Sequence, residues 1–132
     1  MSDDLQLSDL QLAIMRALWE RDEASASEIQ GILADGGRDL AQTTVSTLLS
    51  RLTKRGLVDA RRRGRGFVYR PTIAEHEIRE SMVSRVTDHL FDGDVTALVS
   101  HLLRRTDISR DDLAEVRRLI AAAEQAKESD HE

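Results

Sequence analysis

One continuous stretch constrains the fold more than any other, because a helical pattern in it runs directly into a hairpin pattern. Residues 39–71 read DLAQTTVSTLLSRLTKRGLVDARRRGRGFVYRP. The apolar residues of its first half recur at the spacing of one stripe on a helix: Val45, Leu48, Leu49 and Leu52. Gly56 follows where a left-handed C-terminal cap is expected, so the pattern predicts a helix that ends there.

The opposite side of this predicted helix carries small hydroxyls and cations but no carboxylate. Its members are Thr43, Ser46, Thr47, Ser50, Arg51 and Lys54. The chain as a whole is acidic, with a net charge of −5, so an ordinary solvated helix face would mix Glu with Lys. A face without carboxylates indicates a surface that meets phosphates and base edges.

A β-hairpin is predicted directly after this helix. Apolar residues mark its two strands: Leu57, Val58 and Ala60 in the first, and Phe67, Val68 and Tyr69 in the second. The Gly64-Arg65-Gly66 segment supplies the turn, and Pro71 ends the pairing. Five arginines lie on this ribbon: Arg61, Arg62, Arg63, Arg65 and Arg70. Arginine suits phosphates and the minor groove of DNA, although a solvated basic loop is the alternative interpretation.

Two further helices are predicted upstream. Capping boxes mark where they begin: Ser8 with Gln11, and Ser25 with Glu28. The second of these helices closes at Gly36-Gly37, and Asp39 is expected to cap the third helix. Trp19 is expected to pack between helices. Three helices followed by a hairpin form a winged helix-turn-helix, which we expect to occupy residues 1–72.

Residues 73–132 change in character and predict long amphipathic helices, so the fold class is mainly α. Asp94 and the Ser109/Asp112 pair are expected to cap two of these helices. The segments are too few to enclose a core alone, so we expect a second copy of the chain to cover them. The candidate dimerisation residues are Ile78, Met82, Val86, Leu90, Leu98, Leu102, Leu113, Val116 and Ile120.

Charge is distributed unevenly along the chain. Residues 38–70 hold nine basic side chains and two acidic ones, a net charge of +7, which leaves −12 for the remainder. A basic segment within an acidic chain is typical of local nucleic-acid binding.

Several other classes of function find no support. The absence of cysteine excludes disulfides and thiolate sites and favours a reducing cytoplasm. No apolar run approaches the roughly 20 residues that span a bilayer, and residues 1–9 do not resemble a signal peptide. His76-Glu77 begins a zinc-protease-like pattern, but Glu80 stands where the second histidine is required. We therefore expect no enzyme, no metal and no cofactor.

The sequence resembles the penicillinase-repressor family, the BlaI/MecI/CopY group of bacterial winged-helix repressors. The resemblance begins at Leu7-Ser8-Asp9, continues through IMRALW at residues 14–19, and reaches about residue 103. It is strongest in a family pattern that falls on Thr44, Leu48, Arg51, Leu52, Lys54 and Gly56.

The resemblance implies a homodimeric repressor on a palindromic operator, with a role in an antibiotic or cell-envelope stress response. In the β-lactamase branch, a sensor-linked protease cleaves an Asn-Phe bond, and the corresponding pair here is His101-Leu102. The sequence departs from that pair at both residues, which leaves a different protease or a direct ligand as the alternatives. The copper-responsive branch uses a C-terminal cysteine motif, which this chain lacks.

These patterns together predict a DNA-binding surface. Thr43, Ser46, Thr47 and Ser50 are expected near base edges, Gln42, Arg51 and Lys54 on phosphates, and Arg62, Arg63 and Arg65 in or beside the minor groove. The main alternative is a winged helix that binds an acidic protein through the same face. A third possibility is RNA binding, against which the low aromatic content counts.

Overall fold

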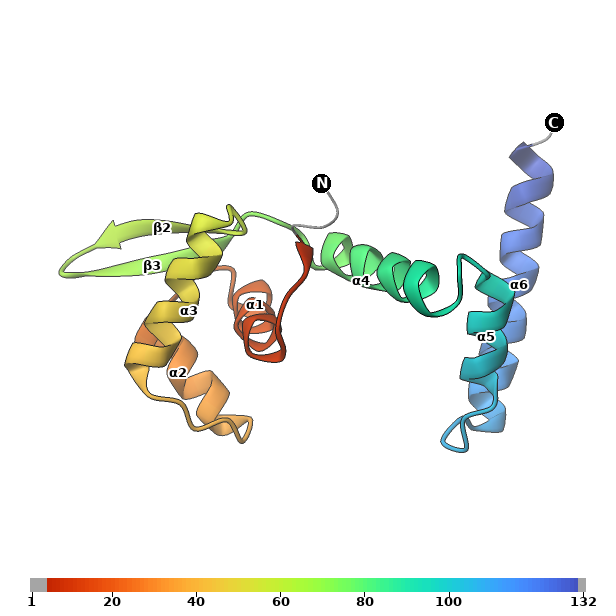
Figure 1. Ribbon diagram of the computed structural model, residues 1–132, viewed down its shortest axis with the longest axis horizontal. Helices are drawn as coiled ribbons and strands as arrows, with labels where there is room; N and C mark the ends of the chain where they lie inside the picture. The colour runs from red at the N-terminus through yellow and green to blue at the C-terminus, as the bar shows by residue number, and fades with distance from the viewer. Residues whose placement is uncertain (1–4, 131–132) are drawn as a thin grey trace. The chain divides into compact units, whose positions relative to one another are not determined.

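The computed structural model describes residues 5–130, which form six helices and a small antiparallel sheet (Figure 1). The chain divides into two compact units, Met1–Val86 and Thr87–Glu132. The first unit contains a winged helix-turn-helix, as the sequence predicted, and the second consists mainly of two helices.

Three helices open the first unit: α1 (Asp9–Arg21), α2 (Ala26–Asp35) and α3 (Gln42–Lys54). Both predicted capping boxes are present, since the backbone N–H of Gln11 donates to Ser8 Oγ at 3.2 Å and that of Glu28 donates to Ser25 Oγ at 3.1 Å. Gly56 ends the α3 segment with a φ of 78°, a left-handed conformation that glycine adopts without strain.

The predicted cap of α3 by Asp39 is wrong. The N-cap is Ala41, which offers no side-chain acceptor, and Asp39 lies too early to reach the first turn. The segment before α3 is held instead by Gln30 of α2, whose side-chain amide donates to the Leu40 carbonyl oxygen at 2.9 Å. A contact between α2 and the loop before α3 therefore holds the chain where α3 begins.

The sheet contains β1 (Ala24–Ser25), β2 (Val58–Arg63) and β3 (Gly66–Pro71), in the order β1-β3-β2 with antiparallel pairing throughout. β2 and β3 form the wing. The sequence placed Gly66 in the turn, but Gly66 pairs with Arg63, so the turn consists of Gly64 and Arg65 alone. Gly64 has a φ of 62°, which explains why a glycine begins the turn.

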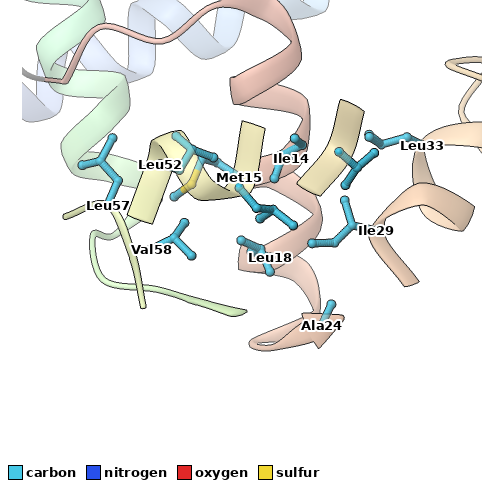
Figure 2. Close-up of a cluster of buried hydrophobic side chains, with 11 residues drawn as sticks. Ile14, Met15, Leu18, Ala24, Ile29, Leu33, Leu52, Leu57 and Val58 are labelled. Carbon is cyan, nitrogen blue, oxygen red and sulfur yellow. The ribbon is translucent and has the colours of Figure 1, made fainter. Parts of the chain in front are cut away.

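The core of the first unit lies between its three helices and the base of the wing (Figure 2). The buried cluster is Ile14, Met15, Leu18, Ala24, Ile29, Leu33, Val45, Leu49, Leu52, Leu57 and Val58. Each fully buried Leu, Ile or Val stabilises the fold by about 1.5–3 kcal/mol. Trp19 packs against this cluster and donates its indole N–H to the Ile73 carbonyl oxygen at 2.8 Å, which ties the chain after the wing to α1.

Helix α4 (Glu75–Leu90) follows the wing, and its residues up to Val86 belong to the first unit. Ile78 is only 1% exposed and lines a small groove with Leu12 and Trp19 of α1. Its predicted role in dimerisation is therefore wrong, because its side chain is covered within one chain. An apolar stripe on a helix predicts burial but does not say which surface provides it.

Helices α5 (Val95–Leu103) and α6 (Arg110–Asp130) make up most of the second unit. Asp94 caps α5, where its carboxylate accepts from the Ala97 N–H at 3.0 Å, and Ser109 and Asp112 form the predicted capping box of α6. Neither Val95–Leu103 nor Arg110–Asp130 contains a buried residue. Within residues 5–130, no helix is both long and apolar enough to cross a membrane.

Candidate nucleic-acid interface

The outer face of α3 keeps the composition that the sequence indicated. Val45, Leu49 and Leu52 are fully buried and turn the opposite side of the helix to solvent. The predicted contact residues on that side are exposed, except for Ser46, which is half-buried: Gln42, Thr43, Ser46, Thr47, Ser50, Arg51 and Lys54. The face therefore offers hydroxyl, amide and cationic groups without a competing carboxylate.

Thr47 occupies the middle of this face, and its hydroxyl is already oriented. Thr47 Oγ1 donates to the Thr43 carbonyl oxygen at 2.9 Å, one turn earlier in the helix. The hydroxyl proton is used within the helix, so toward another molecule the exposed Thr47 oxygen can act as an acceptor. In this rotamer Thr47 can accept a hydrogen bond from a base amino group or contact a thymine methyl group.

A groove lies between the start of α3, the start of α2 and the wing. Its walls are Ser25, Ala26, Ser27, Gln42, Ser46, Gly66, Phe67 and Tyr69. Gln42 and Ser46 are predicted DNA contacts, whereas Ser27 and Phe67 were not predicted as contacts. Phe67 is 48% exposed, so a large apolar ring on the wing is open to solvent.

The five wing arginines are all exposed, but they do not share one face of the ribbon. Directly paired residues of an antiparallel ladder lie on the same face, and successive residues alternate. Arg62 pairs with Phe67 and shares its face, and the Arg62 Cζ atom lies 5.7 Å from the centre of the Phe67 ring. Arg61 pairs with Val68 and lies on the other face. Arg65 is in the turn.

Arg63 has a partner within the chain that the sequence did not predict. Its guanidinium lies 2.9 Å from the carboxylate of Glu23, in the loop between α1 and β1. Glu28 lies near the same cations, and its pKa is lowered chiefly by hydrogen bonds from the Ser25 backbone and hydroxyl and further by the charges of Arg21 and Arg63. The face of the wing that carries Arg63 therefore lies against a cluster of charged residues from the same chain, formed by Glu23, Glu28 and Arg21.

The predicted dimerisation residues other than Ile78 remain wholly or partly uncovered. Met82, Leu98, Leu113 and Val116 are half-buried, whereas Val86, Leu90, Leu102 and Ile120 are exposed. Five more exposed apolar residues were not predicted: Val83, Val95, Val99, Leu103 and Leu119. The i, i+4 spacing of Val95, Val99 and Leu103 is a signal that could have identified three of them.

The predicted cleavage pair lies inside a helix. His101 and Leu102 are both exposed within α5, and the His101 ring packs edge-on against Phe91 with ring centres 5.9 Å apart.

A family model described as Penicillinase repressor matches residues 7–122. The chain belongs to the penicillinase repressor family. This finding confirms the resemblance seen in the sequence, and it makes the chain a DNA-binding transcriptional repressor and not an enzyme.

Relatives within the penicillinase repressor family are similar along nearly their whole length. The chain is 32% identical over 120 residues to the transcriptional regulator BlaI of Mycobacterium tuberculosis, which covers 90% of this chain and 86% of that protein. It is 25% identical over 115 residues to the methicillin resistance regulatory protein MecI of Mammaliicoccus sciuri, with coverage of 87% and 93%.

A solved structure extends the likeness in fold beyond close relatives. The YusO protein from Bacillus subtilis is 15% identical, with a TM-score of 0.56 and coverage of 94% of this chain and 79% of that chain. At this identity the similarity concerns the fold alone, and it agrees with a winged-helix architecture for this family member.

Proposed function

We propose that this repressor acts as a homodimer on a palindromic operator, with α3 of each copy in the major groove and each wing beside the minor groove. One observation carries the proposal: the same chain has two exposed surfaces of different chemistry. The first is the carboxylate-free face of α3 beside the arginine-rich wing, and the second is formed by the exposed apolar residues of α5 and α6. The first surface suits DNA and the second suits another copy of the same chain.

On the DNA side, the exposed residues of α3 divide by chemistry. Thr43, Ser46, Thr47 and Ser50 are short enough to approach base edges when the helix lies in the major groove. Gln42, Arg51 and Lys54 are longer and lie where they would contact the phosphates at the groove walls. Arg62 and Arg65 of the wing extend this basic surface toward the adjacent minor groove.

On the protein side, α5 and α6 do not bury an apolar side chain between them along their described lengths. Five of their exposed apolar residues are Val95, Val99, Leu103, Leu119 and Ile120. A contiguous exposed apolar surface marks an interaction site. A second copy is the simplest occupant, because most soluble oligomers are symmetric homo-oligomers.

The symmetry of a dimer has a consequence for the operator. Two identical α3 helices related by a two-fold axis would read the same half-site in opposite directions, so the operator is an inverted repeat. The names of the relatives, which include a methicillin resistance regulator and a penicillinase repressor, support a role in an antibiotic or cell-envelope stress response. A DNA partner supports a cytoplasmic location for the protein.

Release from the operator has two candidate routes, a regulatory protease that acts at His101-Leu102 and a directly bound ligand. Proteases cut exposed, irregular backbone most readily, whereas this bond lies within α5. Cleavage therefore requires that α5 opens locally, and a second copy packed on α5 would resist that opening.

The proposal is tested by a fluorescence titration of the purified chain against its own upstream intergenic DNA and a scrambled duplex, repeated at several salt concentrations. We expect tight, salt-dependent binding to the native fragment that saturates at two chains per site. Equal weak binding to both duplexes would contradict specific operator binding. A salt slope near zero would favour the alternative in which the winged helix binds a protein.

A further inference from the structure

The two faces of the wing are turned toward different parts of the first unit. Along β2, Ala60 and Arg62 pair with Tyr69 and Phe67, and these four residues share one face. Tyr69 packs against the core and, with Phe67, lines the groove that also contains Gln42 of α3. This face, which carries Arg62, is therefore turned toward α3, the helix that we place in the major groove.

The other face is turned toward the loop between α1 and β1. Arg61 and Arg63 alternate with Arg62 and so lie on this face. β1 adds to the same sheet, where Ser25 pairs with Val68, and Glu23 is two residues before Ser25. Glu23 therefore lies on the Arg63 side of the sheet, which agrees with the 2.9 Å ion pair between them.

Phe67 holds the Arg62 guanidinium without neutralising it. A cation 5.7 Å from an aromatic centre is within the range of cation–π attraction, which restricts the side chain but leaves its charge and donors unpaired. Glu23, in contrast, places a full negative charge beside Arg63. Two arginines that are adjacent in the sequence thus offer very different net charges to a phosphate backbone.

We propose that these two arginines have different tasks in operator binding. Arg62, positioned by Phe67, contacts the DNA beside the minor groove, while Arg63, held by Glu23, ties the wing to the α1–β1 loop and does not contact DNA. Phe67 is a positioning residue, because it acts through Arg62. This inference deepens the proposed function and rests on it.

The test uses the full chain and a duplex selected by the wild-type protein from a random-sequence library, titrated at several salt concentrations. Arg62→Ala, Arg63→Ala and Arg61→Ala each remove one cation, so they have equal effects on overall charge. Arg61→Ala is the matched control, since Arg61 is exposed on the outer face of the same strand. Thermal unfolding of every variant confirms that the fold is retained.

We expect Arg62→Ala to weaken binding about tenfold and to lower the salt slope by about one. Arg63→Ala and Arg61→Ala should agree with each other to about twofold and should lower the slope by less than Arg62→Ala does. A loss for Arg63→Ala equal to or greater than that for Arg62→Ala overturns the division of tasks, and so does a loss for Arg61→Ala that equals that for Arg62→Ala.

Phe67 is tested by three changes. Phe67→Leu keeps an apolar side chain but removes the aromatic ring, so we expect about three- to fivefold weaker binding. Phe67→Tyr keeps the aromatic ring and should bind DNA as tightly as the wild type. Adding Phe67→Leu to the Arg62→Ala variant should not weaken DNA binding any further. Wild-type binding by Phe67→Leu, or additive losses in the double variant, overturns the positioning role. A wild-type chain that selects no duplex at all refutes the proposed function itself, before any variant is compared.

Discussion

The two compact units of this chain differ in how they bury apolar side chains. In the first unit, Ile14, Leu18, Ile29, Val45, Leu49 and Leu52 are all fully buried. In the second, α5 and α6 have no buried residue along their described lengths, and Leu90 of α4 is 75% exposed. The first unit has a closed core of its own, whereas the second presents an apolar surface that a single chain leaves uncovered.

This difference separates two kinds of amphipathic helix that look alike in a sequence. Both α3 and α5 carry apolar residues at helical spacing, but α3 has neighbours in the same chain that cover its stripe. The α5 stripe lacks such cover. The expected effects of substitution therefore differ in kind: stability of one chain for the first unit, and association of two chains for the second.

The largest expected effect is in the closed core. Leu49→Ala should lower the free energy of unfolding by about 2–5 kcal/mol, because Leu49 is fully buried and its truncation leaves a cavity. Denaturant titration measures this loss. Leu102→Ala is the matched control in the second unit, and in dilute solution it should cost less than about 1 kcal/mol because Leu102 is 44% exposed. Similar losses for both variants would contradict the comparison.

The next effect concerns association. Val99→Asp places a charge in the exposed apolar stripe of α5, where an unpaired carboxylate is costly to cover. We expect the dimer dissociation constant, measured by sedimentation equilibrium, to rise at least about 100-fold, while the unfolding of the first unit is unchanged. Thr96→Asp introduces the same charge at another exposed position of α5 and should leave the dimer intact. Equal effects of the two variants would place the interface elsewhere.

A smaller effect sharpens the function of the first unit. Thr47→Ala removes the outward acceptor at the centre of α3, so we expect specificity at one base position to relax by about 1–3 kcal/mol. Binding to operators that carry every base at each position measures this change. If specific and random DNA lose affinity equally, Thr47 does not read a base.

The smallest effect concerns pH. Hydrogen bonds from Ser25 lower the pKa of the Glu28 carboxyl from its ordinary 4.5, so ionised Glu28 stabilises the folded state. This contribution is complete above about pH 4.5 and is lost as the pH falls through the lowered folded-state value. Glu28→Gln should therefore reduce the loss of stability on acidification, as followed by thermal unfolding at pH 3 to 6. An unchanged pH profile would show that the capping box does not contribute in this range.

Local patterns predicted much of the fold. The capping boxes at Ser8, Ser25 and Ser109 depend on residues three positions apart, so the sequence contains both partners of each hydrogen bond. The hairpin and the buried stripe of α3 were predictable for the same reason. Asp39 is a residue type that often caps helices, but the N-cap of α3 is Ala41, and the loop before it is held by the Gln30–Leu40 hydrogen bond from α2.

Features that depend on register or on distant contacts were not predictable. Arg62 and Arg63 are equivalent in the sequence, and only the pairing of β2 with β3 assigns them to opposite faces. The partner of Arg63 lies 40 residues earlier in the chain. Ile78 fitted the stripe of α4, but its burial against α1 requires the path of the chain after the wing.

The most direct test of the account is the stoichiometry of the full chain on two duplexes of equal length, one with the complete inverted repeat and the other with a single half-site. Sedimentation velocity at a fixed salt concentration measures the mass of each complex. We predict two chains on the complete repeat, and in the Val99→Asp variant a single chain on the half-site with weaker, non-cooperative filling of the repeat. Wild-type protein that binds the complete repeat as a single chain would contradict the claim that the second unit joins two copies on DNA.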